Sequence, residues 1–309
     1  MIKTIFSAAL PVSERLVIRK NRIVGAGGDG PRLALVTGIH GDELEGQYVA
    51  FELARRLGER LDDLAGTVDI YPAINPLGLS SHEHGAPGFD IDLDRTFPGS
   101  VNGNLTDALA HAVFSDVMGA DVCIDVRSTS SYLQEVTQVR IDEQDAGKLV
   151  RIASALNARL VWVRVPTAVL DSTLAHCLNA SGVPTLEVQM GSGMRISQDA
   201  GTWLVEGLLN LLEHLGAWTG PTIQLPPPMV STGKNVATLV AESPGIFVPK
   251  VECGCRIRPG QVMGIVADPL EGVIKQEIAS PCEGMLFALR TYPMVYPGSL
   301  LARVLRGGR

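Results

Sequence analysis

The sequence predicts an α/β fold in which a mixed sheet is flanked by helices, with a smaller all-β unit at the carboxyl end. Up to about residue 220, short apolar runs alternate with segments of helical periodicity, which is typical of a sheet covered on both faces. From Asn235 onward, apolar runs are separated by Gly and Pro without a helical period, which indicates strands alone. A proline-rich stretch, 221–228, lies between them, so we expect domains at 1–225 and 226–309.

The expected elements of the first part follow one another along the chain. Strands are expected over residues 12–24, 33–36, 67–71, 122–126, 160–165 and 183–188. Helices are expected over 105–118, 146–157 and 172–180, and in an amphipathic segment with leucines at 204, 208, 211 and 215. A further helix should open at Asp42, the expected N-cap, with Glu45 three residues later.

Composition excludes several classes of protein. The chain has 309 residues, of which 46% are hydrophobic and 19% charged, as in an ordinary globular protein. The net charge of −7 and the absence of a long Lys/Arg run argue against nucleic acid as a partner. No signal-like start or apolar run of transmembrane length is present, and the odd number of cysteines, 5, fits free thiols. We therefore expect a cytoplasmic protein without membrane contact.

The segment 36–46 carries the first candidate site. An apolar strand ends at Gly38, a turn follows, and a helix begins, so His40 and Glu43 lie where strand becomes helix. Open α/β sheets bind ligands at the carboxyl ends of their strands, and imidazole with carboxylate suits zinc. A polar turn residue and a glutamate favoured by the helix dipole are the alternative interpretation.

Three further segments contribute polar residues that could belong to the same site. Acids recur at Asp90, Asp92 and Asp94, which would share one side of an extended chain. The loop before them holds His82 and His84. Glu187 lies inside an apolar strand, and burial is expected to raise the pKa of its carboxyl group toward useful acid–base values.

These segments together resemble the succinylglutamate desuccinylase/aspartoacylase family, relatives of the zinc carboxypeptidases. The resemblance covers essentially the whole chain. It rests on G-x-H-G-x-E-x-x-G at 38–46, Asn75-Pro76, D-L-x-R-x-F-P-G at 92–99, and P-T-L-E at 184–187. The tail resembles the lipoyl-like barrel of one branch of the family, although no lysine lies near Tyr292-Pro293, so a carrier role is not expected.

The resemblance implies a zinc-dependent hydrolase that cleaves the amide bond of a small N-acylated amino acid or related amine. His40 and Glu43 would bind one zinc ion, and Glu187 would act as general base and then general acid. Arg95 would bind a substrate carboxylate or the developing oxyanion, with Asn75 and residue 94 also at the substrate. The barrel is compatible with a homo-oligomer.

Two positions depart from the family pattern. The D-L-H block that supplies the third zinc ligand reads Asp125-Val126-Arg127, and a guanidinium has no lone pair for a metal. We therefore expect weak zinc binding, with His82 or His84 as the substitute ligand. The other departure is Asp94, an acid where the family has an amide, which suits an amine or guanidine on the substrate.

Three interpretations follow. In the first, zinc is held with a substitute ligand and the chain is a deacylase. In the second, the site is metal-deficient, Arg127 pairs with Glu43 or Glu187, and the chain is an inactive relative that binds a small molecule or a partner. In the third, Arg127 and Glu187 carry a catalytic, metal-independent reaction. The presence of both His40 and Glu43 favours the first.

Overall fold

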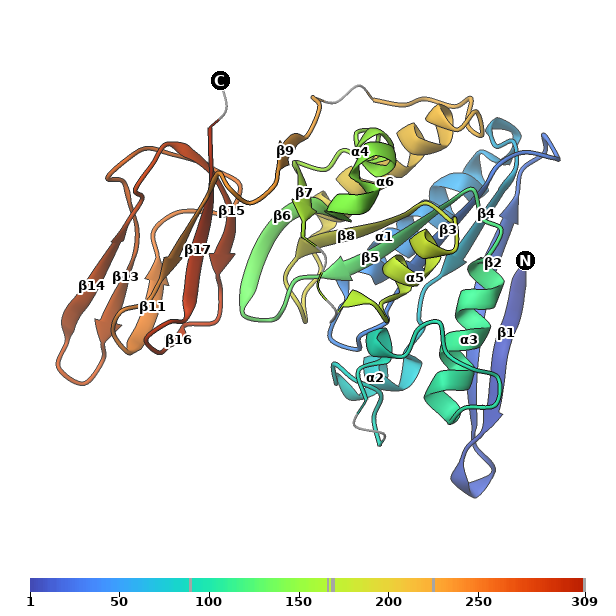
Figure 1. Cartoon of the computed structure of the whole chain (residues 1–309), viewed down its shortest axis with the longest axis horizontal. Helices are drawn as coiled ribbons and strands as arrows, with labels where there is room; N and C mark the ends of the chain where they lie inside the picture. Colours follow the sequence, from blue (N-terminus) through green and yellow to red (C-terminus); the bar gives the residue numbers. More distant parts are fainter. Residues whose placement is uncertain (89–90, 166, 168–169, 224–225, 308–309) are drawn as a thin grey trace.

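The computed structural model describes residues 1–88, 91–165, 167, 170–223 and 226–307; Asp90 lies outside this range. An amino-terminal part of helices around a sheet lies beside a carboxyl-terminal part that consists of strands (Figure 1). This arrangement confirms the predicted fold class, a mixed sheet flanked by helices followed by a second, all-β sheet. None of the described helices is long and apolar enough to span a membrane.

The main sheet has a parallel centre. Its strands run in the order β4 (Thr67–Tyr71), β3 (Arg32–Thr37), β5 (Val122–Ser128) and β8 (Thr185–Gly191). On one side, antiparallel strands β2 (Arg15–Val24) and β1 (Ile2–Ala9) follow, and on the other, β6 (Leu133–Asp142) is antiparallel to β8. Strands β7 (Leu160–Arg164) and β9 (Met229–Ser231) continue parallel to β6. The carboxyl ends of β3, β5 and β8 therefore meet at one edge.

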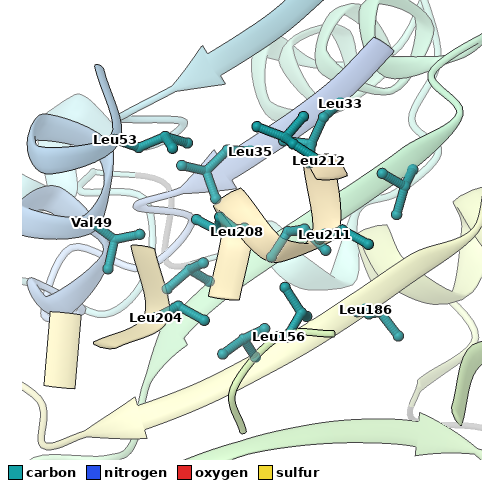
Figure 2. Close-up of a cluster of buried hydrophobic side chains, with 14 of the residues drawn as sticks. Leu33, Leu35, Val49, Leu53, Leu156, Leu186, Leu204, Leu208, Leu211 and Leu212 are labelled. Carbon is teal, nitrogen blue, oxygen red and sulfur yellow. The ribbon is translucent and has the colours of Figure 1, made fainter. Parts of the chain in front are cut away.

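Helices cover both faces of this sheet because its strands are apolar on both sides. One face packs against α1 (Glu45–Glu59), α4 (Ala146–Ala153) and α6 (Gln198–His214), with Leu33 and Leu35 pointing into that core (Figure 2). The other packs against α3 (Leu105–Val117) and α5 (Leu174–Ala180), with Ala34 and Val36 pointing into it. Each fully buried leucine stabilises the fold by about 1.5–3 kcal/mol.

The same alternation of side chains places the polar residues of the central strands. In β5, Ile124 and Val126 face the α1 side, so Asp125 and Arg127 face the α3 side. In β8, Glu187 lies between apolar neighbours that face the α1 side, so it also points to the α3 side. These polar side chains gather at the carboxyl edge of the sheet, next to the turn after β3.

The carboxyl-terminal strands extend the main sheet. Strand β15 (Gly284–Arg290) pairs antiparallel with the start of β6, and then follow β17 (Leu300–Arg306) and β10 (Val236–Val240), with β12 (Arg256–Ile257) also on β15. A separate four-stranded sheet is formed by β14 (Val273–Ala279), β13 (Val262–Asp268), β11 (Gly245–Pro249) and β16 (Met294–Val295). One continuous sheet thus joins the two parts, while their division at 225/226 and the lipoyl-like barrel remain predictions.

Several expected elements differ from the structure. Strand β6, with alternating polar and apolar residues, was not predicted, and neither was β1. Helix α1 begins at Glu45 and not at Asp42, and no side chain of its N-cap residue accepts a hydrogen bond there. Instead, the hydroxyl oxygen of Ser128 accepts from the Glu45 backbone amide at 3.2 Å. Short elements complete the chain: α2 (Pro76–Ser81) and 3-10 turns Pro11–Ser13, Leu61–Asp63, Leu93–Arg95 and Glu143–Asp145.

Candidate active site

His40 lies at the centre of the carboxyl edge, between two carboxylates. Its Nδ1 is 2.8 Å from Oε1 of Glu43, and its Nε2 is 2.8 Å from Oδ1 of Asp92. Burial alone would lower the pKa of this imidazole, but the hydrogen bonds to Asp92 and Glu43 outweigh burial and raise that pKa to about 9. The structure thus joins the two predicted zinc ligands and adds Asp92.

The turn that carries His40 is pressed against the loop after α2. A side chain at Gly41 would clash with the backbone of Gly78, so the close approach requires glycine. The amide of Asn75 holds this loop, because it accepts from the Gly78 backbone at 2.9 Å and donates to the Gly85 carbonyl at 2.8 Å. The Gly41 backbone N–H in turn donates to the carbonyl of His84 at 3.3 Å. These contacts bring His84 to His40.

His84 and His40 are in direct contact. Their rings stack with centroids 3.7 Å apart and planes inclined by 14°. Nδ1 of His84 is 2.9 Å from Oδ1 of Asp42, the residue expected to cap α1, so this carboxylate orients an imidazole instead. Potential ligand atoms of His40, His84 and Asp92 all lie within 4.8 Å of one another.

The donor atoms of this cluster fit a divalent metal ion. Imidazole nitrogens and carboxylate oxygens are the ligands of zinc. Oε2 of Glu43 is buried and has no hydrogen-bond partner among the described residues, so one more oxygen is available. His82, the other proposed substitute ligand, lies outside the group: it ends α2 in the left-handed conformation, with its side chain exposed.

Arg127 is buried and fully paired. Its Nη1 and Nη2 donate to the two carboxylate oxygens of Asp94, both at 2.7 Å, and Nη2 and Nε donate to Oδ2 of Asp125 at 2.6 and 3.0 Å. The expected pairing of Arg127 with Glu43 or Glu187 is therefore wrong. Burial raises the pKa of Asp125 to about 7, against the lowering effect of the Arg127 charge.

The residues expected at the substrate differ in availability. Asp94 is occupied by Arg127, and the side-chain amide of Asn75 holds the loop after α2, so neither presents a free polar group. The side chain of Arg95 is 41% exposed beside the site, and its Nε lies 3.3 Å from Oδ2 of Asp92.

Glu187 is buried and held by arginines. Nη2 of Arg164 donates to its Oε2 at 2.8 Å, Nε2 of Gln189 donates to its Oε1 at 3.2 Å, and Nη1 of Arg140 lies 3.9 Å from Oε1. Burial alone would raise the pKa of Glu187, but the Arg164, Arg127 and Arg140 charges outweigh it and lower that pKa to about 2. The expectation of a raised pKa is therefore wrong.

Sequence reasoning missed the partners of Glu187. Arg140 lies directly opposite Glu187 in the β6–β8 pairing, and Arg164 lies opposite Asp142 in the β6–β7 pairing, where Nε of Arg164 donates to Oδ1 of Asp142 at 2.8 Å. One feature of the sequence pointed to these partners, because Arg164 is a charged residue at the end of an apolar strand. Since strand β6 was not predicted, Glu187 and Asp142 could not be placed beside Arg164.

A cavity of about 1010 Å³ lies elsewhere, between β6, the start of α6 and the carboxyl-terminal strands. Glu135, Trp203 and Met285 line it, but His40 and Arg127 do not. The candidate site is thus defined by its converging polar groups and not by this cavity.

Known proteins match this chain in sequence and in structure. Residues 29–215 match the succinylglutamate desuccinylase/aspartoacylase catalytic domain. The N-alpha-acetyl-L-2,4-diaminobutyric acid deacetylase of Halomonas elongata is 26% identical over 287 residues, which cover 89% of this chain and 82% of the relative.

Solved structures share the fold along nearly the whole chain. A succinylglutamate desuccinylase/aspartoacylase from Rhodobacter sphaeroides is 23% identical, with a TM-score of 0.79 and coverage of 99% of this chain and 96% of that one. The product-bound ectoine utilization protein EutE (DoeB) from Ruegeria pomeroyi is 21% identical, with a TM-score of 0.81 and coverage of 99% and 95%. Since the family match spans more than half of its residues, the chain belongs to the succinylglutamate desuccinylase/aspartoacylase family.

Proposed function

We propose that this chain is a metal-dependent deacylase that hydrolyses the amide bond of a small N-acylated amino acid or related amine. The observation that carries the proposal is His40, fixed between Glu43 and Asp92 after β3 at the carboxyl edge of the sheet, with Glu187 on β8, the second strand along from β3. The deacetylase relative supports the same reaction class, because its substrate is an N-acetylated diamino acid.

The residues around His40 would hold the metal, with zinc as the expected ion. His40 supplies a nitrogen donor, and Glu43, Asp92 and His84 supply the remaining candidates. When bound, such an ion supplies a Lewis acid that polarises the scissile carbonyl group.

The protein's own groups would orient the substrate and move the proton. Arg95, exposed beside the site, is suited to bind a carboxylate of the substrate through its planar guanidinium group. Glu187 would take a proton from the attacking water and pass it to the leaving amine. Its Oε1 is held by longer hydrogen bonds, from Gln189 at 3.2 Å and Arg164 at 3.4 Å, than Oε2, which accepts from Arg164 at 2.8 Å.

A second function is favoured by one observation, the closed cluster of Arg127 with Asp94 and Asp125. The guanidinium occupies the position where the family pattern has its third metal ligand. A chain that has lost this ligand would bind an N-acylated amino acid without cleaving it.

The two functions predict different results with purified protein. N-acetylated amino acids and diamino acids are supplied, and free amine is measured after chelation and after zinc is returned. A deacylase loses turnover on chelation and regains it with zinc, His40→Ala is inactive, and His82→Ala serves as the control with full activity. Zinc-loaded protein that is thermally stabilised by these compounds yet releases no amine would support the second function instead.

A further inference from the structure

Glu135 is a buried carboxylate at the junction between the two parts of the chain. It lies opposite Ala288 in the β6–β15 pairing, and Ala288 lies opposite Arg303 in the β15–β17 pairing. Residues opposite one another share a face of the sheet, and the small Ala288 lets the long side chain of Arg303 pass over it. Nη1 of Arg303 thus comes within 3.8 Å of Oε1 of Glu135, whose side chain is only 1% exposed.

The other carboxylate oxygen of Glu135 is surrounded by donors. This atom, Oε2, accepts hydrogen bonds from Nε2 of Gln138 at 2.6 Å, Nη2 of Arg140 at 2.9 Å and Oγ1 of Thr129 at 3.0 Å. The hydrogen bond from Arg140 joins two ionised groups, which makes it stronger than a bond between neutral groups. Glu135 therefore fixes one arm of the Arg140 guanidinium group.

The other arm of Arg140 stops short of Glu187. Nη1 of Arg140 lies 3.9 Å from Oε1 of Glu187, which is beyond the length of a hydrogen bond. Arg164, in contrast, donates directly to Oε2 of Glu187 at 2.8 Å. The two arginines thus act on Glu187 in different ways, because Arg164 binds the carboxylate whereas Arg140 is tied to Glu135.

We propose that Glu135 is a positioning residue, which restrains Arg140 and so keeps its guanidinium group from closing on Glu187. This inference deepens the proposed function and rests on it, because Glu187 is the group that would move the proton. A second direct ion pair would stabilise the ionised form of Glu187 further and make the carboxylate a weaker base. Glu135 therefore preserves the basicity that the other cations leave to Glu187.

Arg140 has the freedom to make this movement. Its side chain is 25% exposed, and its carboxylate partners among the described residues are Glu135 and Glu187. When Glu135 loses its charge, Glu187 is the partner that remains. Closing the gap from 3.9 Å to about 2.8 Å, at an effective dielectric constant of about 20, would lower the pKa of Glu187 by about one unit.

The first test measures a distance and not turnover. In the crystal structure of full-length Glu135→Gln, Nη1 of Arg140 should lie within ~3 Å of Oε1 of Glu187. Removal of the charge leaves Arg303 uncompensated as well, so the double variant Glu135→Gln with Arg303→Gln is used if the single variant does not fold. An Arg140 side chain that keeps its native position, or that turns into solvent, would overturn the proposal.

Turnover of the metal-loaded protein on an accepted N-acyl substrate gives the second test. In Glu135→Gln, kcat should fall by roughly 3–10-fold with little change in KM, because a weaker base slows the proton transfer. The double variant of Glu135→Gln with Arg140→Gln should regain most of this loss, since no guanidinium group remains at residue 140. A loss that the double variant does not regain would show that Glu135 is only structural.

Two control variants separate the restraint from a general loosening of the structure. Arg303→Gln weakens the same contact between the two parts but leaves Arg140 bound to Glu135, so it should keep native turnover. Glu143→Gln removes an exposed glutamate just after β6 and should also behave like the native protein. A loss in Arg303→Gln equal to that in Glu135→Gln would overturn the proposal. Movement of Arg140 in a protein that releases no amine would support the restraint and refute the deacylase.

Discussion

Nη2 of Arg164 lies 2.8 Å from Oε2 of Glu187, and Nε of the same guanidinium lies 2.8 Å from Oδ1 of Asp142. Asp142 thus orients the arginine that holds the candidate acid–base residue. A carboxylate fixed in this way stays ionised even in acid, consistent with its pKa of about 2. Such a group donates a proton readily but accepts one weakly, so Arg164 determines how well Glu187 can serve as a base.

Removal of that arginine should make Glu187 easier to protonate. In Arg164→Gln, the pKa of Glu187 is expected to rise from about 2 toward its ordinary value of 4.5. Carbon NMR of labelled glutamate carboxyl groups measures this pKa in the metal-free protein, with Glu187→Gln identifying the signal. Arg258→Gln, which removes an exposed arginine of the carboxyl-terminal part, is the control. An unchanged titration of Glu187 would show that Arg164 does not control it.

Glu187→Gln tests the acid–base role itself. The amide keeps the shape of the side chain but cannot take the proton, so turnover should fall by about 10²–10⁴-fold while substrate binding survives. Turnover is compared with binding of an uncleaved analogue by calorimetry. If turnover on an accepted amide substrate stays the same, Glu187 has no part in proton transfer, and its pairing with Arg164 is structural.

Arg127 and Asp94 should be energetically coupled. Arg127→His removes a buried guanidinium from two acids and is expected to lower the free energy of unfolding by about 3–5 kcal/mol. Asp94→Asn in the same chain removes one uncompensated charge, so the double variant should lose less than the sum of the single losses. Urea unfolding of the native protein, both single variants and the double variant gives the coupling energy, and strict additivity would contradict the pairing.

The same variants test the metal prediction made from the sequence. A histidine at 127 provides a lone pair where the family pattern has its third ligand, so Arg127→His should tighten zinc binding. The structure adds that Asp94 then loses its partner and also its hold on the turn that presents Asp92. We therefore expect Arg127→His to bind zinc more tightly than the native protein, and the double variant with Asp94→Asn to bind it less tightly than Arg127→His alone, because the amide removes a negative charge near the dication; chelator competition measures both.

Acid should destabilise the protein through Asp69, a fully buried carboxylate in strand β4. Its oxygens contact Lys20 at 3.1 Å, Arg22 at 2.6 Å and Arg32 at 2.8 Å. Burial alone would raise the pKa of Asp69, but these cations outweigh burial and lower it from 3.8 to about 2. Because the folded pKa is the lower one, the stabilisation is present above pH 3.8 and is lost as the pH falls toward 2.

The loss amounts to about 2 kcal/mol over that interval. Urea unfolding across this pH range measures it. Asp69→Asn should be less stable at neutral pH and should show a shallower decline in acid. An equally steep decline in Asp69→Asn would assign the acid sensitivity to other carboxylates.

The sequence predicted the elements whose signals are local. The apolar runs of β3, β5 and β8 and the glycines around His40 identify the carboxyl edge and the candidate pair His40 and Glu43 without knowledge of the fold. Pairings across strands were not predictable in this way. Asp94 and Arg127 are far apart in the chain, so Asp94 was interpreted as a substrate contact and Arg127 as a residue without a lone pair for the metal, whereas each is the partner of the other.

The missed strand β6 accounts for most of the remaining errors. Its sequence mixes Gln, Glu, Thr and Arg with Val and Ile, so its apolar content resembles that of a loop. Yet it brings Arg140 to Glu187, brings Asp142 to Arg164 and pairs with β15. Both the low pKa of Glu187 and the continuity of the two parts follow from this strand.

That continuity leads to a prediction about proteolysis. Limited digestion should cut between residues 221 and 234, where the sequence is rich in proline, and outside β9, which is paired with β7. The fragments should nevertheless stay together, because Ala288–Arg290 pair with Leu133–Glu135 and the ring of Tyr292 packs edge-on against Tyr132 at 5.2 Å. Size-exclusion chromatography of the nicked protein, with and without denaturant, measures this association. Fragments that separate in native buffer would mean that the β6–β15 pairing is too weak to join the two parts, and a first cut within 33–58 would contradict the domain division itself.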